Sequence, residues 1–316
     1  MTSRGVQIRL KRGWIAAGHC GGIASGEEDP GLAKAKAEQR PLLVIDGDSF
    51  AHRAYHGVPK SVQRAGGKGG NAILGFANYL IRLWEAEQPR AIFVGWDKLS
   101  EQNWRARIFP DYQGGRDFEP SIVDQLEVLP QLVDALGFLY GKGGGFEADD
   151  FIASAAIAEE KAGGTALVAS GDRDAFQLAT DKVTILHPVK AGEIAWIGPA
   201  EVRQRYGVNP QQVPDFIALR GDPSDKLPGA RGVGEKTAAS LLQRYPNLEA
   251  MLADGKFETQ ADDLRLYKRI ATMVTDAPLP RIADQSPDWA AAAALTREWE
   301  LKALSERLTT LAKTMK

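Results

Sequence analysis

Acidic side chains follow several apolar runs of this sequence at the point where each run ends. Asp46 comes directly after the run 42–45, Asp97 follows the run 91–94 closely, and Asp172 follows the run 165–169. Acids with this kind of placement, or at the start of a helical pattern, form the set Asp46, Asp97, Glu147, Asp149, Asp150, Asp172, Asp174, Asp222 and Asp225. Because carboxylate oxygens are hard ligands, such a set suits Mg²⁺ or Mn²⁺.

These acids can act together only if the fold gathers them. In a doubly wound sheet the carboxyl ends of the strands meet in one crevice, so distant acids can converge there. Converging carboxylates repel one another unless cations neutralise them, and two divalent ions can activate water and stabilise the leaving oxygen of a phosphodiester. A single acid at a helix start is more often a cap, but three acids in the four residues 147–150 exceed what one helix start uses.

A second motif is the glycine-rich stretch 227–238, which contains Gly232, Gly234 and Lys236. It has the form of a helix-hairpin-helix, whose turn offers backbone N–H groups and a helix N-terminus to a phosphate. A plain glycine turn between helices is the alternative. The nearby cations Arg220, Lys226 and Arg231 favour sequence-independent contacts with DNA.

The spacing of apolar residues predicts the elements that position these groups. Short apolar runs predict strands, longer stretches with a period near 3.6 predict helices, and the two alternate up to residue 197. This pattern predicts an α/β fold with a mostly parallel central sheet and helices on both faces. We expect a mobile N-terminal extension (1–40), an α/β domain (41–197) with an exposed loop or helical flap at about 98–119, and a helical lobe (198–316) with the hairpin at about 215–245.

Composition limits the function classes. With 44% hydrophobic and 25% charged residues the chain is an ordinary globular protein, and a net charge of -2 means that any nucleic-acid surface is local. The one cysteine, Cys20, cannot form an internal disulfide, and Cys20 with His19 makes no zinc site. No apolar run is long enough for a membrane span, so we expect a cytoplasmic protein with no membrane partner.

Several short motifs, taken in order, resemble the 5′-nuclease or flap endonuclease family, which includes the 5′-3′ exonuclease domain of bacterial DNA polymerase I. They are Ile45–Gly47, Arg53–His56, Glu147–Asp150, Ser170–Asp174, and Gly221–Asp225 through Gly234–Ala238. The resemblance covers about residues 42–278. It implies a structure-specific 5′-3′ exonuclease and flap endonuclease of DNA replication and repair, with a metallonuclease domain, a helical arch and a helix-three-turn-helix lobe.

The resemblance also implies cofactors, partners and residue roles. It implies two or more Mg²⁺ or Mn²⁺ ions held by the nine acids directly or through water, and K⁺ in the hairpin. The partner would be DNA with 5′ flaps, nicks or 5′ ends, bound by a monomer at the nucleoid. In the arch, Tyr112 would stack on a base, Arg116 would clamp a phosphate and Arg105 would supply a further cation. The residues implied in DNA binding are Arg53, Arg231, Gly232, Gly234, Lys236 and Thr237.

Two departures from the family pattern leave alternatives open. Gln113 stands where the family commonly has lysine, and Lys226 stands beside a predicted metal ligand where asparagine is usual. A non-catalytic, structure-specific DNA-binding protein is therefore one alternative. A haloacid dehalogenase-like phosphatase, with Asp46 as nucleophile, is another, although it has no use for residues 147–150 or the hairpin. Because no polymerase region follows, we expect a stand-alone nuclease.

Overall fold

The structure is a computed structural model that describes residues 40–115, 117–189 and 192–314. The predicted extension 1–40, with Cys20 and His19, lies outside the described residues except for Arg40. Arg116 also lies outside them. Within the described residues, no helix combines the length and the apolar character needed to cross a lipid bilayer.

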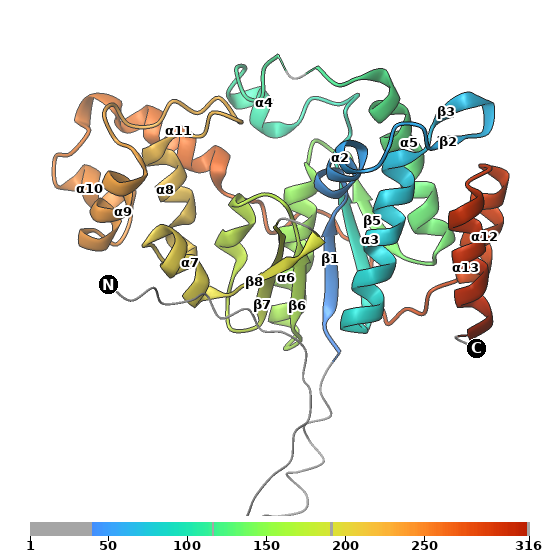
Figure 1. Ribbon diagram of the computed structural model, residues 1–316. Helices are drawn as coiled ribbons and strands as arrows, with labels where there is room; N and C mark the ends of the chain where they lie inside the picture. The colour runs from blue at the N-terminus through green and yellow to red at the C-terminus, as the bar shows by residue number, and fades with distance from the viewer. Residues whose placement is uncertain (1–39, 116, 190–191, 315–316) are drawn as a thin grey trace, which may run out of the picture. The chain divides into compact units, whose positions relative to one another are not determined.

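A six-stranded sheet forms the centre of the α/β part, as Figure 1 shows. Its strands are β1 (Leu42–Asp46), β4 (Ala91–Trp96), β5 (Leu139–Lys142), β6 (Ala166–Ala169), β7 (Val183–Pro188) and β8 (Ile194–Ile197), in the order β5-β4-β1-β6-β7-β8. All neighbouring pairs are parallel except β7 and β8. The central strand β1 therefore ends beside β4 and β6, and the predicted mostly parallel sheet is confirmed.

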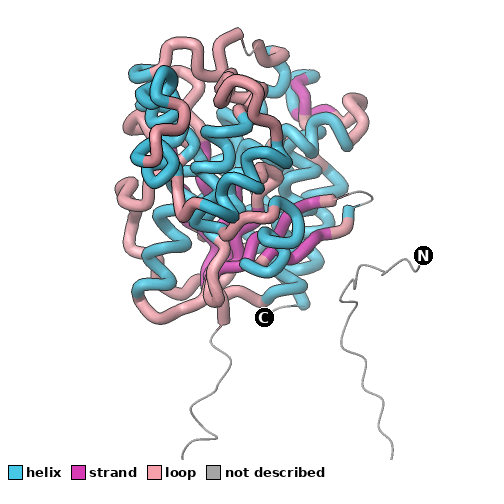
Figure 2. The backbone as a smooth tube through the Cα atoms, turned by 90° about the vertical axis from the view of Figure 1, so that its left-hand side faces the viewer, coloured by secondary structure: helices cyan, strands magenta, loops and turns pink. Residues whose placement is uncertain are grey.

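Alternate side chains of β1 enter different hydrophobic clusters, because successive residues of a strand point to opposite faces of the sheet. Leu43 and Ile45 pack with α2 (Gly47–Gly57), α3 (Asn71–Glu87) and α5 (Pro120–Ala135). Leu42 and Val44 pack on the other face with α6 (Ala148–Lys161). Helices thus cover both faces of the sheet, as predicted, and Figure 2 shows the strands lying among them.

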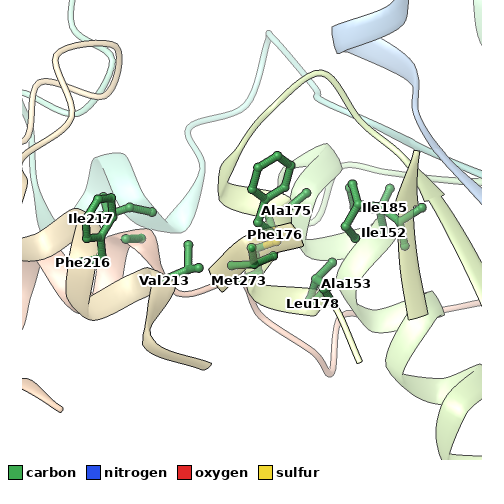
Figure 3. Packing of buried hydrophobic residues seen from close by; sticks show 14 of the residues in the cluster. Ile152, Ala153, Ala175, Phe176, Leu178, Ile185, Val213, Phe216, Ile217 and Met273 are labelled. Atoms are coloured by element: carbon green, nitrogen blue, oxygen red, sulfur yellow. The ribbon is translucent and has the colours of Figure 1, made fainter. Parts of the chain in front are cut away.

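After β8 the chain is helical as far as Ala271. The helices are α7 (Pro199–Tyr206), α8 (Val213–Arg220), α9 (Glu235–Arg244), α10 (Leu248–Ala253) and α11 (Ala261–Ala271). Their core is continuous with that of the sheet, because Phe216 and Ile217 of α8 belong to the same cluster as Phe176 and Ile152 (Figure 3). The helical segment is therefore held against the α/β part by a shared apolar core.

The last two helices, α12 (Trp289–Glu298) and α13 (Lys302–Thr314), pack with the α/β part instead. Their buried side chains join the cluster formed by α3 and α5, and the rings of Trp84 and Trp289 meet edge to face at 5.2 Å. The stretch 198–316, which we expected to form one lobe, is thus divided between two regions of the molecule. The composition of the sequence did not reveal this return of the chain.

Two short segments differ from a plain loop. The glycine-rich stretch 66–70 belongs to a hairpin of β2 (Gln63–Arg64) and β3 (Lys68–Gly69). Gly66 and Gly67 turn it with φ of 75° and 69°, values that only glycine adopts without strain. Among its described residues the predicted flap 98–119 contains one helix, α4 (Trp104–Ile108), which Asn103 caps by accepting a hydrogen bond from the Ala106 amide.

Candidate active site

The sheet brings the predicted acids to one edge. Asp46 is the last residue of β1, Asp97 follows β4, and Asp172 lies in the loop after β6. Glu147, Asp149 and Asp150 stand at the start of α6, and Asp174 opens the 3-10 helix Asp174–Leu178. Asp222 and Asp225 lie in the turn that follows α8. The parallel register explains the convergence, because the strands end at the same edge.

Local hydrogen bonds fix the carboxylate of Asp46. Its Oδ1 accepts from the Ser49 amide at 2.9 Å, which caps α2, and its Oδ2 accepts from Ser170 Oγ at 2.8 Å. Gly47 is required next to it, because a Cβ there would lie 2.5 Å from the ring of Trp96. The chain can therefore turn from β1 into α2 while the carboxylate stays at the strand end.

Asp97 is held from two sides, and one of these contacts comes from Asp48. The amide of Asp97 donates to Asp48 Oδ2 at 2.7 Å, and Asp97 Oδ1 accepts from the Ala148 amide at 2.7 Å. Asp48 is buried and was not among the predicted site residues. Its place two residues after the end of a strand was the only signal in the sequence. Asp48 positions Asp97 and adds a further carboxylate to the cluster.

Burial and mutual repulsion raise the pKa values of these acids. Burial, with the charges of Asp97 and Asp172, raises the pKa of Asp46 from 3.8 to about 7. Burial, with the charges of Asp46 and Asp172, raises the pKa of Asp149 well above its usual value. Either bound protons or divalent cations can reduce the repulsion within such a cluster. Divalent cations would bind the carboxylates in their ionised form.

A second group of acids surrounds Asp174. Burial raises the pKa of Asp174 well above its usual value, and the nearby charges of Asp172, Asp225 and Asp222 raise it further. The charge of Asp172 thus raises the pKa of both Asp46 and Asp174, so Asp172 belongs to both groups of acids. The arrangement provides two adjacent regions of negative charge, which is what a pair of divalent ions requires.

One further observation shows that these carboxylate oxygens fit divalent cations. Asp149 Oδ1 is buried and has no hydrogen-bond partner in the structure, so it is left over for a ligand. Within the described residues no three acidic, histidine or cysteine side chains already stand at the spacing of a formed ion site. Several of these carboxylates are instead directed to loop amides and hydroxyls, as Asp46 and Asp97 show.

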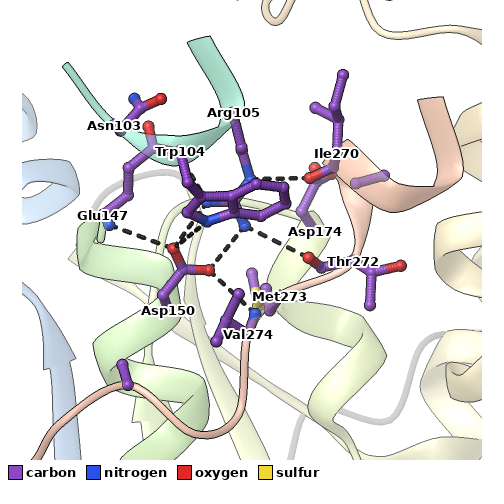
Figure 4. A network of polar contacts seen from close by, with 12 residues as sticks. Asn103, Trp104, Arg105, Glu147, Asp150, Asp174, Ile270, Thr272, Met273 and Val274 are labelled. Atoms are coloured by element: carbon purple, nitrogen blue, oxygen red, sulfur yellow. Dashed lines mark hydrogen bonds and ion pairs between the residues drawn. The ribbon is translucent and has the colours of Figure 1, made fainter. Parts of the chain in front are cut away.

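Asp150 faces a different partner from the other acids. Its two oxygens accept from Arg105 Nη1 and Nη2 at 2.9 and 2.8 Å, and Oδ2 also accepts from Trp104 Nε1 at 3.0 Å (Figure 4). Asp150 is 0% exposed, and these donors occupy its carboxylate oxygens. We therefore correct its expected role: these contacts suit a residue that positions Arg105 rather than a metal ligand.

Arg105 is buried at the base of the predicted arch, with 4% of its surface exposed. Besides Asp150 it bonds Glu147 Oε2 at 2.7 Å and donates to the Ile270 carbonyl at 2.8 Å. Although burial alone would lower it, the charges of Asp150 and Glu147 raise the pKa of Arg105 above its usual value. The expected contact of this guanidinium with DNA does not fit its burial, because its donors are already used inside the protein.

Tyr112 and Gln113 lie directly against the acids. Tyr112 is buried and its hydroxyl donates to Glu147 Oε2 at 3.3 Å, so its ring is not offered to a base as we expected. Gln113 Nε2 donates to Tyr112 Oη at 2.9 Å and to Asp225 Oδ1 at 3.1 Å. Residue 113 has φ of 51°, a left-handed conformation that turns its side chain toward the cluster. The flap therefore places an amide, and not a cation, beside a predicted metal ligand.

The predicted DNA-binding turn is exposed. Arg231, Gly232, Gly234, Lys236 and Thr237 are all exposed at the start of α9. The turn and one face of α11 line a depression of about 510 Å³, to which Asp263 and Tyr267 of α11 contribute. Gly232 has φ of 74° and open space around it. Backbone N–H groups in this geometry can receive a phosphate.

Arg53, the last of the predicted DNA contacts, lies outside the hairpin. It is exposed on α2 and donates to the Val189 carbonyl at 2.8 Å.

Comparison with known proteins supports this geometry. The sequence model of a family described as "5'-3' exonuclease, N-terminal resolvase-like domain" matches residues 41–207. A second, described as "5'-3' exonuclease, C-terminal SAM fold", matches residues 208–290. Together they cover both the acids at the strand ends and the hairpin. They give no support to the phosphatase alternative, in which Asp46 would be a covalent nucleophile.

Curated relatives and a solved structure agree with these matches. DNA polymerase I of Mycobacterium tuberculosis is 38% identical over 267 residues, which are 80% of this chain and 29% of the polymerase. DNA polymerase I of Bacillus subtilis is 35% identical over 254 residues, 77% of this chain and 29% of that protein. The chain thus spans less than a third of the length of these relatives. A structure of the bacteriophage T5 D15 flap endonuclease with DNA and metal ions has the same fold, with a TM-score of 0.62 and 18% identity over 87% of this chain and 100% of that one.

Proposed function

The chain belongs to the 5′-3′ exonuclease family, and from that premise we propose that it is a divalent-metal-dependent 5′ nuclease of DNA. Its substrates would be DNA with 5′ ends, nicks and 5′ flaps. The protein would act as a monomer in DNA replication and repair, in the cytoplasm at the nucleoid. The observation that carries the proposal is the convergence of carboxylates from β1, β4, α6 and the loop after β6. Asp46 is buried, Asp97 and Asp149 are half-buried, Asp172 is exposed, and the buried Oδ1 of Asp149 has no hydrogen-bond partner.

The residues that would hold the ions follow from the two groups of acids. Asp46, Asp97, Asp149 and Asp172 would hold one, and Asp172, Asp174, Asp222 and Asp225 would hold another, directly or through water. Such ions, Mg²⁺ or Mn²⁺, supply a water of lowered pKa and stabilise the leaving oxygen of a phosphodiester. Ser49 and Ser170 keep Asp46 in position, and Asp48 keeps Asp97 in position.

The hairpin would hold the duplex next to this site. Its backbone N–H groups and Lys236 would contact phosphates, so binding would not depend on base sequence. K⁺ bound in the same turn is part of this proposal, and the depression beside Gly232 and Gly234 would hold it. The helical segment from α8 to α11 would thus grip DNA while the α/β part cleaves it.

The experiment is incubation of the protein with 5′-labelled flap, nicked and blunt duplexes in Mg²⁺, Mn²⁺ or EDTA, followed by sizing of the products. The proposal predicts short 5′ products or a released flap with either ion and intact DNA in EDTA. Tight binding without products under all conditions would support the non-catalytic alternative. Release of phosphate from a 5′-phosphorylated end, with a phosphoaspartate on the protein, would support a phosphatase.

A further inference from the structure

A groove of about 980 Å³ lies on the face of α11 that is turned away from the hairpin. Arg265, Lys268 and Arg269 of α11 line it, whereas Asp263 and Tyr267 of the same helix line the depression at the hairpin turn. These two sets of residues lie on opposite sides of the helix, so α11 separates the groove from the depression at the hairpin turn. A ligand of the groove is therefore different from the duplex that we place on the hairpin.

The groove is basic and part of its charge is uncommitted. Its lining contains four cations and two acids, and Arg265 and Lys268 are paired, with Glu249 at 2.9 Å and Asp215 at 2.7 Å. Lys161, at the end of α6, and Arg269 are exposed and have no ion-pair partner among the residues that the structure describes. Two free cations along a groove are suited to successive phosphates of a strand.

An oriented aromatic ring lies at one end of the groove. Trp104 is fixed by its hydrogen bond to Asp150, and its ring has the Arg105 guanidinium 4.5 Å from its centroid (Figure 4). The guanidinium of Arg269 lies 6.0 Å from the same centroid. The indole remains partly exposed and lines the groove. A fixed aromatic ring beside a cation is the arrangement on which bases of a single strand stack.

The groove adjoins a cleft at the acidic site. Phe146 lines both the groove and this cleft of about 130 Å³, whose walls include Asp97, Gln113 and Glu147. A strand that passes the carboxylates can therefore reach Trp104 by crossing Phe146. The duplex, on the hairpin side of α11, would end where this strand begins.

From these observations we infer that the groove binds the single-stranded 5′ arm of the substrate after it has passed the acidic site. Trp104 stacks on a base, and Arg269 and Lys161 contact phosphates. This inference rests on the proposed nuclease function and extends it to a specificity for substrates whose 5′ arm is several nucleotides long. An acidic protein segment could use the same cations, but it would not depend on the length of a DNA arm.

The test measures dissociation constants in EDTA, so that no cleavage occurs, for one duplex carrying a 5′ arm of one, five or ten thymidines. The variant is Lys161→Glu/Arg269→Glu, and the matched control is Lys302→Glu/Lys313→Glu on α13, where both lysines are exposed and equally free of ion pairs among the described residues. Cleavage of the same DNAs in Mg²⁺ by the unaltered protein is recorded separately.

The unaltered protein and the control should bind the longer arms more tightly than the shortest one. The groove variant should lose roughly tenfold, about 1.4 kcal/mol, of affinity for the ten-nucleotide arm beyond any change with the one-nucleotide arm. The extra salt dependence of the long arm, about 1.4 in the slope for two phosphates, should disappear as well. An arm-length dependence that is the same in the groove variant and the control would overturn the inference. Absence of cleavage by the unaltered protein in Mg²⁺ would instead reject the nuclease function.

Discussion

Asp46 illustrates at the residue scale how burial makes an ordinary carboxylate depend on its counter-ions. Without metal it keeps its proton in the folded protein up to about pH 7, whereas the unfolded chain loses that proton near the ordinary pKa of 3.8. The folded state therefore binds more protons across this window, and the free energy of unfolding contributed by Asp46 falls as the pH rises through it. Bound cations would reverse this trend, because they favour the ionised form.

This sign gives a test by thermal unfolding in EDTA. Between about pH 4 and pH 7 the Tm of the unaltered protein should fall relative to that of Asp46→Asn, which cannot ionise at this position. Adding Mg²⁺ at the upper end of the range should stabilise the unaltered protein more than the variant. Parallel Tm curves for the two proteins in EDTA would show that Asp46 is not the buried, proton-binding group described above.

Gln113 gives a second prediction at this scale. Its amide already lies 3.1 Å from Asp225 Oδ1, so a lysine in its place would bring a positive charge to the site. A cation offsets the charge that builds in the transition state better than an amide does. We expect Gln113→Lys to raise single-turnover cleavage of a 5′ flap by roughly tenfold, about 1.4 kcal/mol in the barrier, with a smaller change in DNA affinity. Lys226→Ala, alone and in combination, controls for a substitute cation, and an unchanged or lower rate in Gln113→Lys would contradict the placement of residue 113.

The sequence revealed the acids because each follows an apolar run or opens a helix. It did not reveal the partner of Asp150, since the pairing with Arg105 joins residues 45 positions apart and depends on how the flap folds back. Asp48 was missed for a related reason. Its contact with the Asp97 amide exists only because β1 and β4 end side by side.

At the scale of elements, Arg105 ties three parts of the molecule together. It belongs to α4, pairs with Glu147 and Asp150 at the start of α6, and donates to the Ile270 carbonyl near the end of α11. A buried charge that loses its partner is costly, whereas an exposed one is not. Of the described flap side chains that bond these acids, Arg105 is the one that brings a buried positive charge to them.

Arg105→Gln should lower the free energy of unfolding by about 3 to 5 kcal/mol, because it leaves two buried carboxylates without a cation. Arg107→Gln is the matched control on the same helix, since Arg107 is exposed, and it should change stability by no more than about 0.5 kcal/mol. Adding Asp150→Asn to Arg105→Gln should restore part of the loss. Denaturant unfolding of the three variants decides the matter, and equal stabilities for Arg105→Gln and Arg107→Gln would refute the anchoring role.

Most long elements could be predicted from their periodicity. The helix Asn71–Glu87 is indicated by apolar residues that repeat at the helical period, and the strand Ile194–Ile197 by a short continuous apolar run. The helices α12 and α13 were not assigned, since an alanine-rich stretch and a polar amphipathic one lack a distinctive apolar pattern until α3 and α5 cover them.

At the scale of the whole molecule, the proposed function assigns DNA binding and DNA cleavage to different parts of the chain. The acids lie at the carboxyl edge of the sheet, and the exposed hairpin cations lie on the helical segment. Lys236→Ala should weaken binding to duplexes of any sequence equally and reduce the salt slope by about 0.9, as expected when one phosphate contact is lost. Lys302→Ala is the control. Binding that varies strongly with base sequence would speak against a grip on the backbone.

The same separation allows the most direct test of the central claim, which is that the carboxylates gathered at the carboxyl edge of the sheet hold catalytic cations. Asp149→Asn removes one anionic oxygen, and Asp181→Asn is its control, an exposed acid in the loop before β7 at the opposite end of the sheet. The measurement is the single-turnover rate on a 5′-flap DNA in Mg²⁺, with the dissociation constant of the same DNA determined in Ca²⁺.

We predict that Asp149→Asn lowers the rate by at least about a thousandfold, about 4 kcal/mol in the barrier, while its affinity for DNA stays within about threefold and Asp181→Asn behaves like the unaltered protein. A rate close to that of the unaltered protein in Asp149→Asn would contradict the account.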